Sequence, residues 1–172
     1  KMKFYTIKKN KRRTGMVNQL LNFSFFISKK EISYKIKFTE SCIYDLNKIG
    51  LYGVNKVFGL TWGIMGVHNN SARFGWKPLD KSRIMIYAYV YFGGIKKEIE
   101  ICTVNINEYY TLSISEKKEK IVFNVKNQIK NSGSTLELKC PKLPKLGYTN
   151  FLYFGGSKKN QQDIIIEMEK VK

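Results

Sequence analysis

The chain has 172 residues, 43% of them hydrophobic, and its 31 Lys and Arg against 13 Asp and Glu give a formal net charge of +18. This length fits a single domain, residues 1–172, whose core needs no metal or crosslink. Cys42, Cys102 and Cys140 are far apart and lack C-x-x-C spacing, which disfavours a disulfide framework and a zinc site. No apolar run is long enough to span a bilayer, so we expect no membrane partner.

Residues 1–30 form a basic segment. From Lys1 to Lys37 there are 11 basic residues and one acid, Glu31. Such clustering predicts a polyanionic partner, because neutralising phosphates releases condensed counterions. A solvated, frayed terminus is the alternative. Polar residues interrupt the apolar run Leu20–Ile27, and Lys29–Lys30 stand where a signal peptide would have small residues. We therefore expect a cytoplasmic, bacterial location.

The next segment contains one strand and the only helix that the sequence predicts. Tyr34, Ile36 and Phe38 alternate with polar residues, which is typical of a half-buried strand with a basic outer face. Thr39 is a candidate cap for a short helix in which Ile43, Leu46 and Ile49 recur, with Gly50 as its terminator.

Glycines divide the apolar stretch that follows. Gly53, Gly59, Gly63 and Gly66 interrupt residues 54–67, which predicts bent strands where backbones approach closely. Residues 68–78, from His68 to Pro78, are rich in Asn and Gly and predict a long loop.

The second half of the chain is regular. One strand has two apolar faces: the first carries Ile84, Ile86, Ala88, Val90 and Phe92, and the second carries Met85 and three tyrosines. This pattern predicts a strand inside a sheet. Gly93–Gly94 after it predicts a hairpin turn. Further strands are expected near residues 98–104, 110–115, 120–125, 135–140 and 163–171. Their spacing predicts an all-β fold, an antiparallel β-sandwich of jelly-roll or concanavalin-like type with one short helix.

Nucleic acid, DNA or RNA, is the partner that the charge favours. Cations contact phosphates without reading sequence, while Arg73 and Trp76 are candidates for a guanine edge or phosphate and for base stacking. The alternative is that the aromatics of residues 68–78 close the core. The candidate nucleic-acid-binding residues are Lys3, Lys8, Lys9, Lys11, Arg12, Arg13, Lys29, Lys30, Lys35, Lys37, Arg73, Trp76 and Lys77.

Catalytic motifs are weak. His68, Ser71 and Asp80 lack a G-x-S-x-G elbow, and the acids do not converge as a two-metal nuclease requires. With His68 as the single histidine, a metal site is not expected either. The sequence therefore predicts a non-catalytic protein without cofactors, and an enzyme centred on His68, Ser71 or Arg73 remains a third hypothesis.

Two resemblances bear on function. Tyr153-Phe154-Gly155-Gly156, interpreted as part of a last hairpin, together with the 68–76 segment resembles a pattern in uncharacterised Bacteroidota β-sandwich proteins and covers the last two-thirds of the chain. Some sandwiches of this shape are lectins or polysaccharide lyases, so this resemblance implies binding or cleavage of an anionic carbohydrate. In size and charge the chain also resembles small accessory proteins of Cas9-type CRISPR defence systems. That resemblance implies an accessory role on a nucleoprotein effector such as Cas9, with a homodimer as one arrangement.

Overall fold

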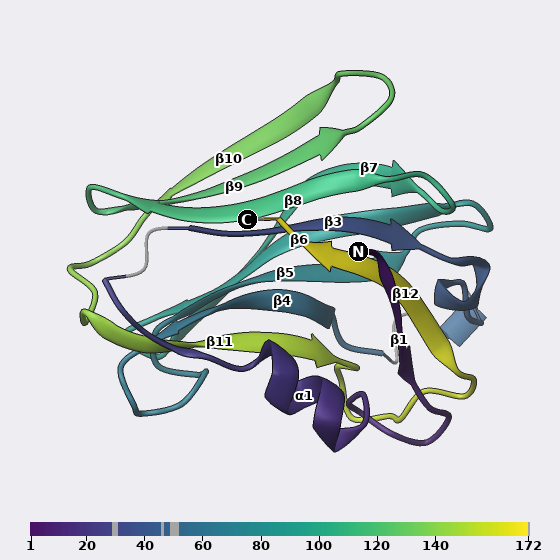
Figure 1. Cartoon of the computed structure of the whole chain (residues 1–172), viewed down its shortest axis with the longest axis horizontal. Helices are drawn as coiled ribbons and strands as arrows, with labels where there is room; N and C mark the ends of the chain where they lie inside the picture. The colour runs from purple at the N-terminus through teal and green to yellow at the C-terminus, as the bar shows by residue number, and fades with distance from the viewer. Residues whose placement is uncertain (29–30, 46, 49–51, 172) are drawn as a thin grey trace.

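The computed structural model describes the chain except residues 29–30, 46, 49–51 and 172, and it shows two six-stranded antiparallel sheets packed face to face (Figure 1). The first sheet has the strand order β1-β12-β3-β8-β9-β10, and the second has the order β2-β11-β4-β5-β6-β7. The elements are β1 (Lys3–Ile7), α1 (Met16–Asn22), β2 (Phe25–Ile27), β3 (Glu31–Phe38), the 3-10 helix η1 (Glu40–Cys42), β4 (Asn55–Trp62), β5 (Ser71–Pro78), β6 (Arg83–Phe92), β7 (Ile95–Asn105), β8 (Tyr110–Lys117), β9 (Lys120–Asn127), β10 (Gly133–Lys139), β11 (Leu146–Tyr153) and β12 (Ile164–Lys170). The predicted all-β, jelly-roll sandwich is confirmed.

Aromatic residues join the two sheets across the core. The Phe74 ring of β5 lies 5.4 Å from that of Phe58 and meets that of Phe123 of β9 edge-on at 5.1 Å. Phe38 of β3 lies 5.5 Å from Trp76. Each of these side chains is fully buried. Edge-to-face and tilted pairs at these separations stabilise the interior beyond their buried area.

Strand periodicity predicted most of the second half correctly. The inward face of β6 carries Ile84, Ile86, Ala88 and Val90, and the strand pairs with β5 and β7, so it lies inside the sheet as expected. Gly93 and Gly94 have positive φ values and form the β6–β7 turn. Strands β7, β8, β9, β10 and β12 all overlap their predicted ranges.

The predicted loop over residues 68–78 is wrong, because Ser71–Pro78 forms strand β5. Its residues alternate between the core side chains Ala72, Phe74 and Trp76 and an opposite face that carries Arg73. Of the residues that suggested a loop, Asn69 and Asn70 lie in the turn before β5, Gly75 lies on the side of the strand facing away from the core, and Pro78 ends the strand.

The predicted helix after Thr39 is also wrong. Only the three residues of η1 are helical, and Ile43 already has an extended backbone. Thr39 caps no helix, because its Oγ1 donates to the Ile165 carbonyl of β12 at 2.7 Å. Leu46, Ile49 and Gly50 lie outside the described residues.

The segment interpreted as part of a last hairpin instead crosses between the sheets. Strand β11 belongs to the second sheet and β12 to the first, so the chain after Tyr153 passes from one to the other. A side chain at Gly53 would meet the Gly156 backbone nitrogen at 2.5 Å. The close backbone approach expected from the glycines is therefore present at Gly53.

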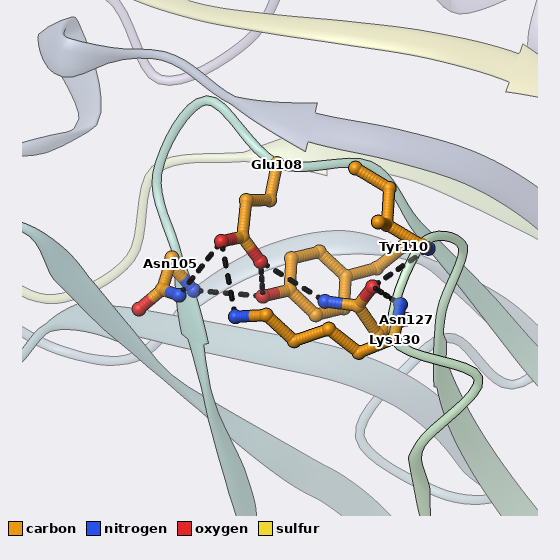
Figure 2. Close-up of polar contacts among 6 residues, drawn as sticks. Asn105, Glu108, Tyr110, Asn127 and Lys130 are labelled. Atoms are coloured by element: carbon orange, nitrogen blue, oxygen red, sulfur yellow. Dashed lines mark hydrogen bonds and ion pairs between the residues drawn. The ribbon is translucent and has the colours of Figure 1, made fainter.

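A hydrogen-bond network joins two turns at one end of the sandwich (Figure 2). Glu108, in the β7–β8 turn, accepts hydrogen bonds from Asn105 and Tyr110 of the same hairpin at 3.0 and 2.8 Å. It also accepts a hydrogen bond at 2.9 Å from Asn127, the last residue of β9, and forms an ion pair at 3.3 Å with Lys130 of the β9–β10 connection. The carboxylate thereby fixes two turns that are separate in sequence.

Candidate functional site

An open cleft of about 460 Å³ lies on the outer face of the second sheet. Its floor consists of outward-facing side chains of β4, β5, β6 and β11. These are Lys56, Arg73, Tyr89, Tyr148, Asn150 and Tyr153. Antiparallel pairing sets Tyr153 opposite Lys56 and Arg73 opposite Tyr89, so the register of four strands assembles the site.

Arg73 is the most informative residue in the cleft. Its side chain is buried, and neither Nε nor Nη2 has a hydrogen-bond partner. The guanidinium carbon lies 4.9 Å from the centre of the Tyr89 ring and 5.8 Å from that of Tyr91. Burying a hydrogen-bond donor without an acceptor costs free energy, and contact of the guanidinium with aromatic rings compensates for only part of that cost. Arg73 therefore carries two unsatisfied donors beneath the surface of the cleft.

Lys56 is a second cation in the same floor. Its Nζ donates to the Val54 carbonyl at 2.6 Å and lies 3.9 Å from the centre of the Tyr89 ring. Burial, and then the nearby positive charge of Arg73, lower the pKa of Lys56 to about 7. The cleft thus holds an arginine and a lysine whose pKa is lowered. A bound anion would stabilise the charged forms of both side chains.

Tyrosines and the single histidine border this charged centre. The His68 ring lies 5.0 Å from that of Tyr91, at an interplanar angle of 30°. Tyr91 therefore contacts both His68 and the Arg73 guanidinium. Burial and a hydrogen bond with Tyr91 raise the pKa of Tyr89, so its phenol stays protonated at neutral pH.

The N-terminal segment and α1 form a wall of the cleft. Arg13 makes an isolated bridge with Tyr153, and its guanidinium carbon lies 5.5 Å from the centre of that ring. Gln19 and Phe23 also line the cleft. Asn150 donates to Thr61 Oγ1 at 2.7 Å, which leaves its amide oxygen as an acceptor beside the cations. The cleft therefore offers cations, amides, phenols and one imidazole.

The predicted nucleic-acid residues are distributed over several surfaces. Arg13 and Arg73 come together at the cleft, while Lys3, Lys9 and Lys11 are exposed. Two of the others form ion pairs, Lys8 with Asp163 and Lys37 with Glu167. Lys35 lies over the Tyr109 ring and Lys77 over the Tyr87 ring. Lys29 and Lys30 are outside the described residues.

Two of the predicted contact residues have structural roles. Trp76 is buried in the core against Phe38, so it cannot stack on a base, and this assignment is wrong. Arg12 donates to the Gly156 carbonyl at 2.5 Å and to the Ser157 carbonyl at 2.8 Å, which anchors the N-terminal segment to the β11–β12 crossing.

Sequence reasoning did not identify Lys56, Tyr148 or Asn150. Lys56 has a recognisable signal, because it is the one charged residue in the apolar stretch from residue 52 to 67. Tyr148 and Asn150 have none, because their proximity to Lys56 depends on the pairing of β11 with β4. Among the described residues, no group of three or more His, Cys, Asp or Glu is placed to hold a metal ion.

No family model and no curated protein matches the chain. Among solved structures it is similar to the alginate lyase from Klebsiella pneumoniae, with a TM-score of 0.58 and 7% identity over 82% of this chain and 59% of that one. It is also similar to alginate lyase A1-II', of polysaccharide lyase family 7, with a TM-score of 0.52 and 9% identity over 86% of this chain and 64% of that one. It is also similar to a functionally unknown protein from Saccharomyces cerevisiae, with a TM-score of 0.54 and 10% identity over 87% of this chain and 71% of that one.

These likenesses show the fold and correct one prediction. The prediction of a protein without enzymatic activity is contradicted, because two of these neighbours in fold are lyases. The carbohydrate alternative fits these neighbours better than nucleic-acid binding does. The Cas9-related role and the homodimer stay predictions.

The helices found in the described residues are all too short, or too polar, to cross a lipid bilayer.

Proposed function

We propose that the cleft binds an acidic polysaccharide and cleaves it by β-elimination. The observation that carries this proposal is the buried guanidinium of Arg73, whose Nε and Nη2 have no partner and which lies beside Lys56. A planar carboxylate on a uronate sugar matches the geometry of a guanidinium and accepts two parallel hydrogen bonds. Binding would remove the cost of the unsatisfied donors and the repulsion between the two cations.

The rest of the cleft suits a sugar chain. Tyr148 and Tyr153, which are partly exposed, provide flat apolar surfaces with polar edges, and Asn150 provides an amide for a hydroxyl group. Clefts of this kind, with few oriented polar groups among aromatic walls, are typical of ligand sites. The fold shared with two alginate lyases supports the same class of substrate.

The side chains favour elimination over hydrolysis. Glycoside hydrolysis typically uses a pair of carboxyl groups, whereas the described residues that line this cleft include no Asp or Glu. In elimination, a base removes the proton from the carbon next to the sugar carboxylate. The electron pair forms a carbon–carbon double bond, the glycosidic carbon–oxygen bond breaks, and an acid protonates the leaving oxygen.

Each step has a matching group in the cleft. Arg73, with Lys56 when protonated, would neutralise the carboxylate and stabilise the negative charge that develops on it. His68 would remove the proton, because imidazole is the side chain suited to proton transfer near neutral pH. A phenol of the lining tyrosines would protonate the leaving oxygen. Hydrogen bonds from Arg73 to the carboxylate would thus orient the sugar for proton removal.

The test is to incubate the protein with alginate, pectate and a neutral xylan and to follow the ultraviolet absorbance of the unsaturated product, with calorimetry for binding. Arg73→Gln should weaken polyuronate binding about thirtyfold or more, because removing one partner of a buried charge pair costs roughly 2 kcal/mol or more. His68→Gln should bind normally and form no product. Arg83→Gln, which removes an arginine outside the cleft, is the control.

The outcomes separate binding from catalysis. Binding that needs Arg73, without any unsaturated product, would remove the elimination step and keep a carbohydrate-binding site. If no acidic polysaccharide binds, or if Arg73→Gln binds as well as the unchanged protein, the proposal fails.

A further inference from the structure

Helix α1 turns its apolar face to the solvent and its polar face to the body of the protein. Its apolar side chains Met16, Val17, Leu20 and Leu21 are all exposed, between 65% and 78%, and no residue of the helix is buried. Its polar side chains point to the protein instead: Gln19 donates to Thr14 Oγ1 at 2.8 Å. A surface helix of a globular domain normally turns its apolar stripe to the core.

Strand β2 continues this apolar surface. Phe25 and Ile27 are 68% and 77% exposed, and they lie opposite Tyr148 and Leu146 of β11. Phe23 connects helix and strand, with its ring 5.0 Å from that of Phe25. We call this surface the α1–β2 patch. It consists of Met16, Val17, Leu20, Leu21, Phe23, Phe25, Ile27 and Leu146.

Basic residues stand at both ends of the α1–β2 patch, with a few acids beside them. Asp163 accepts from the Lys9 backbone nitrogen, and Glu116 and Glu119 line a pocket together with Ser28 and Lys145. Residues 1–28 contain seven Lys and Arg and no acid. Lys9 and Lys11 precede α1, and the Lys145 carbonyl accepts from the Ser28 backbone nitrogen at 2.7 Å, which places Lys145 at the far end of β2. Within the described part of the chain, none of these three lysines forms an ion pair.

We propose that the α1–β2 patch docks on a lipid surface with anionic headgroups. Exposed leucine, phenylalanine and isoleucine side chains would enter the boundary between headgroups and acyl chains, while the flanking lysines contact the headgroups. Two weak signals of this kind together give stable, reversible membrane binding. Docking of this type needs no membrane-spanning segment, so it replaces our expectation of no membrane partner, which rested only on the lack of a membrane-spanning run. It does not depend on what the cleft binds.

Charge decides between this partner and a second copy of the chain. A symmetric pair would place the basic border of one copy against that of the other, and each copy has a formal charge of +18. An anionic bilayer instead complements both the apolar centre and the basic border of the patch. Phe23 also lines the cleft, so a docked protein would hold one wall of its cleft at the lipid surface.

The test is co-flotation of the full chain with vesicles of phosphatidylcholine alone and of phosphatidylcholine with phosphatidylserine. We expect binding to the anionic vesicles that weakens with salt, and little binding to the neutral ones. Leu20→Ser with Leu21→Ser should weaken binding about tenfold or more, because buried methylene groups supply the apolar part of the affinity. Lys9→Gln with Lys11→Gln should weaken it roughly fivefold for each cation removed.

Two matched variants serve as controls. Ile95→Ser with Ile129→Ser removes two exposed apolar residues outside the patch, and Lys97→Gln with Lys126→Gln removes two exposed cations outside it. Loss of binding in the patch variants but not in the controls supports the proposal. Absence of binding to anionic vesicles overturns it, as does a dimer in analytical ultracentrifugation that disappears with Leu20→Ser and Leu21→Ser.

Discussion

Lys56 and Arg73 are placed where they lower the stability of the folded chain in the absence of a ligand. Both side chains are buried and both have lowered pKa values, chiefly because burial disfavours their charged forms. Each also lies against the Tyr89 ring. A buried charge without a counter-ion destabilises the folded state, because nothing compensates for its lost hydration. The same residues should therefore favour binding at the expense of stability.

The first prediction concerns Lys56 and pH. Because its pKa falls from 10.5 to about 7 on folding, the unfolded chain binds more protons between those values, and Lys56 makes the free energy of unfolding rise with pH there. Arg73, Lys96 and Lys77 lower this pKa, while Glu98 raises it. Lys56→Met should stabilise the protein by about 1 kcal/mol or more below pH 7, and thermal unfolding across pH measures this.

Binding of an acidic ligand should show the opposite dependence. A carboxylate next to Lys56 favours its protonated form, so affinity should increase as the pH falls through 7 and binding should take up protons. Calorimetry in two buffers of different ionisation enthalpy measures this uptake, which Lys56→Met should abolish. Equal proton uptake by both proteins would show that Lys56 does not contact the ligand.

At the scale of elements, local sequence patterns predicted strands well and the site poorly. The alternation in β6 is a local signal, and it correctly distinguished a core face from a second face, whose Tyr89 lines the cleft. In β5 the same alternation was hidden, because a cleft-facing strand carries the polar and small residues that also mark loops. Helix α1 was missed because it has only seven residues, no side-chain cap and no acidic residue in its first turn. The link between Lys56 and β11 depends on pairing between distant segments.

The network around Glu108 gives a prediction about acid stability. Hydrogen bonds from Asn105 and Tyr110, with smaller contributions from Asn127 and Lys130, lower the pKa of Glu108 to about 2 from 4.5. Its stabilising effect is therefore present above pH 4.5 and disappears as the pH falls through about 2. Glu108→Gln should make the free energy of unfolding less dependent on pH in that window, as measured by urea unfolding. Glu31→Gln, an exposed acid outside the network, is the control, and an equal change in both variants would contradict this role.

At the scale of the whole molecule, the cations fall into two groups that differ in their surroundings. The cleft concentrates Arg13, Lys56 and Arg73 over a shaped floor, whereas Lys3, Lys9 and Lys11 are exposed and Lys37 is neutralised by Glu167. Exposed cations bind any polyanion with a steep dependence on salt. Contacts inside the cleft depend on shape and on individual hydrogen bonds, and are screened less.

Nucleic-acid binding, which stays a prediction, can therefore be separated from the cleft. Mobility-shift titrations at two salt concentrations should show DNA affinity that falls steeply with salt. Replacing Lys3, Lys9 and Lys11 by Gln should reduce the slope of log affinity against log salt by roughly 0.9 for each phosphate that the protein no longer neutralises. Arg73→Gln should leave DNA affinity unchanged, because Arg73 lies in the cleft and not among the exposed lysines. If Arg73→Gln abolishes DNA binding, the cleft is the nucleic-acid site. If DNA does not bind even at low salt, the exposed lysines have no role in binding nucleic acid.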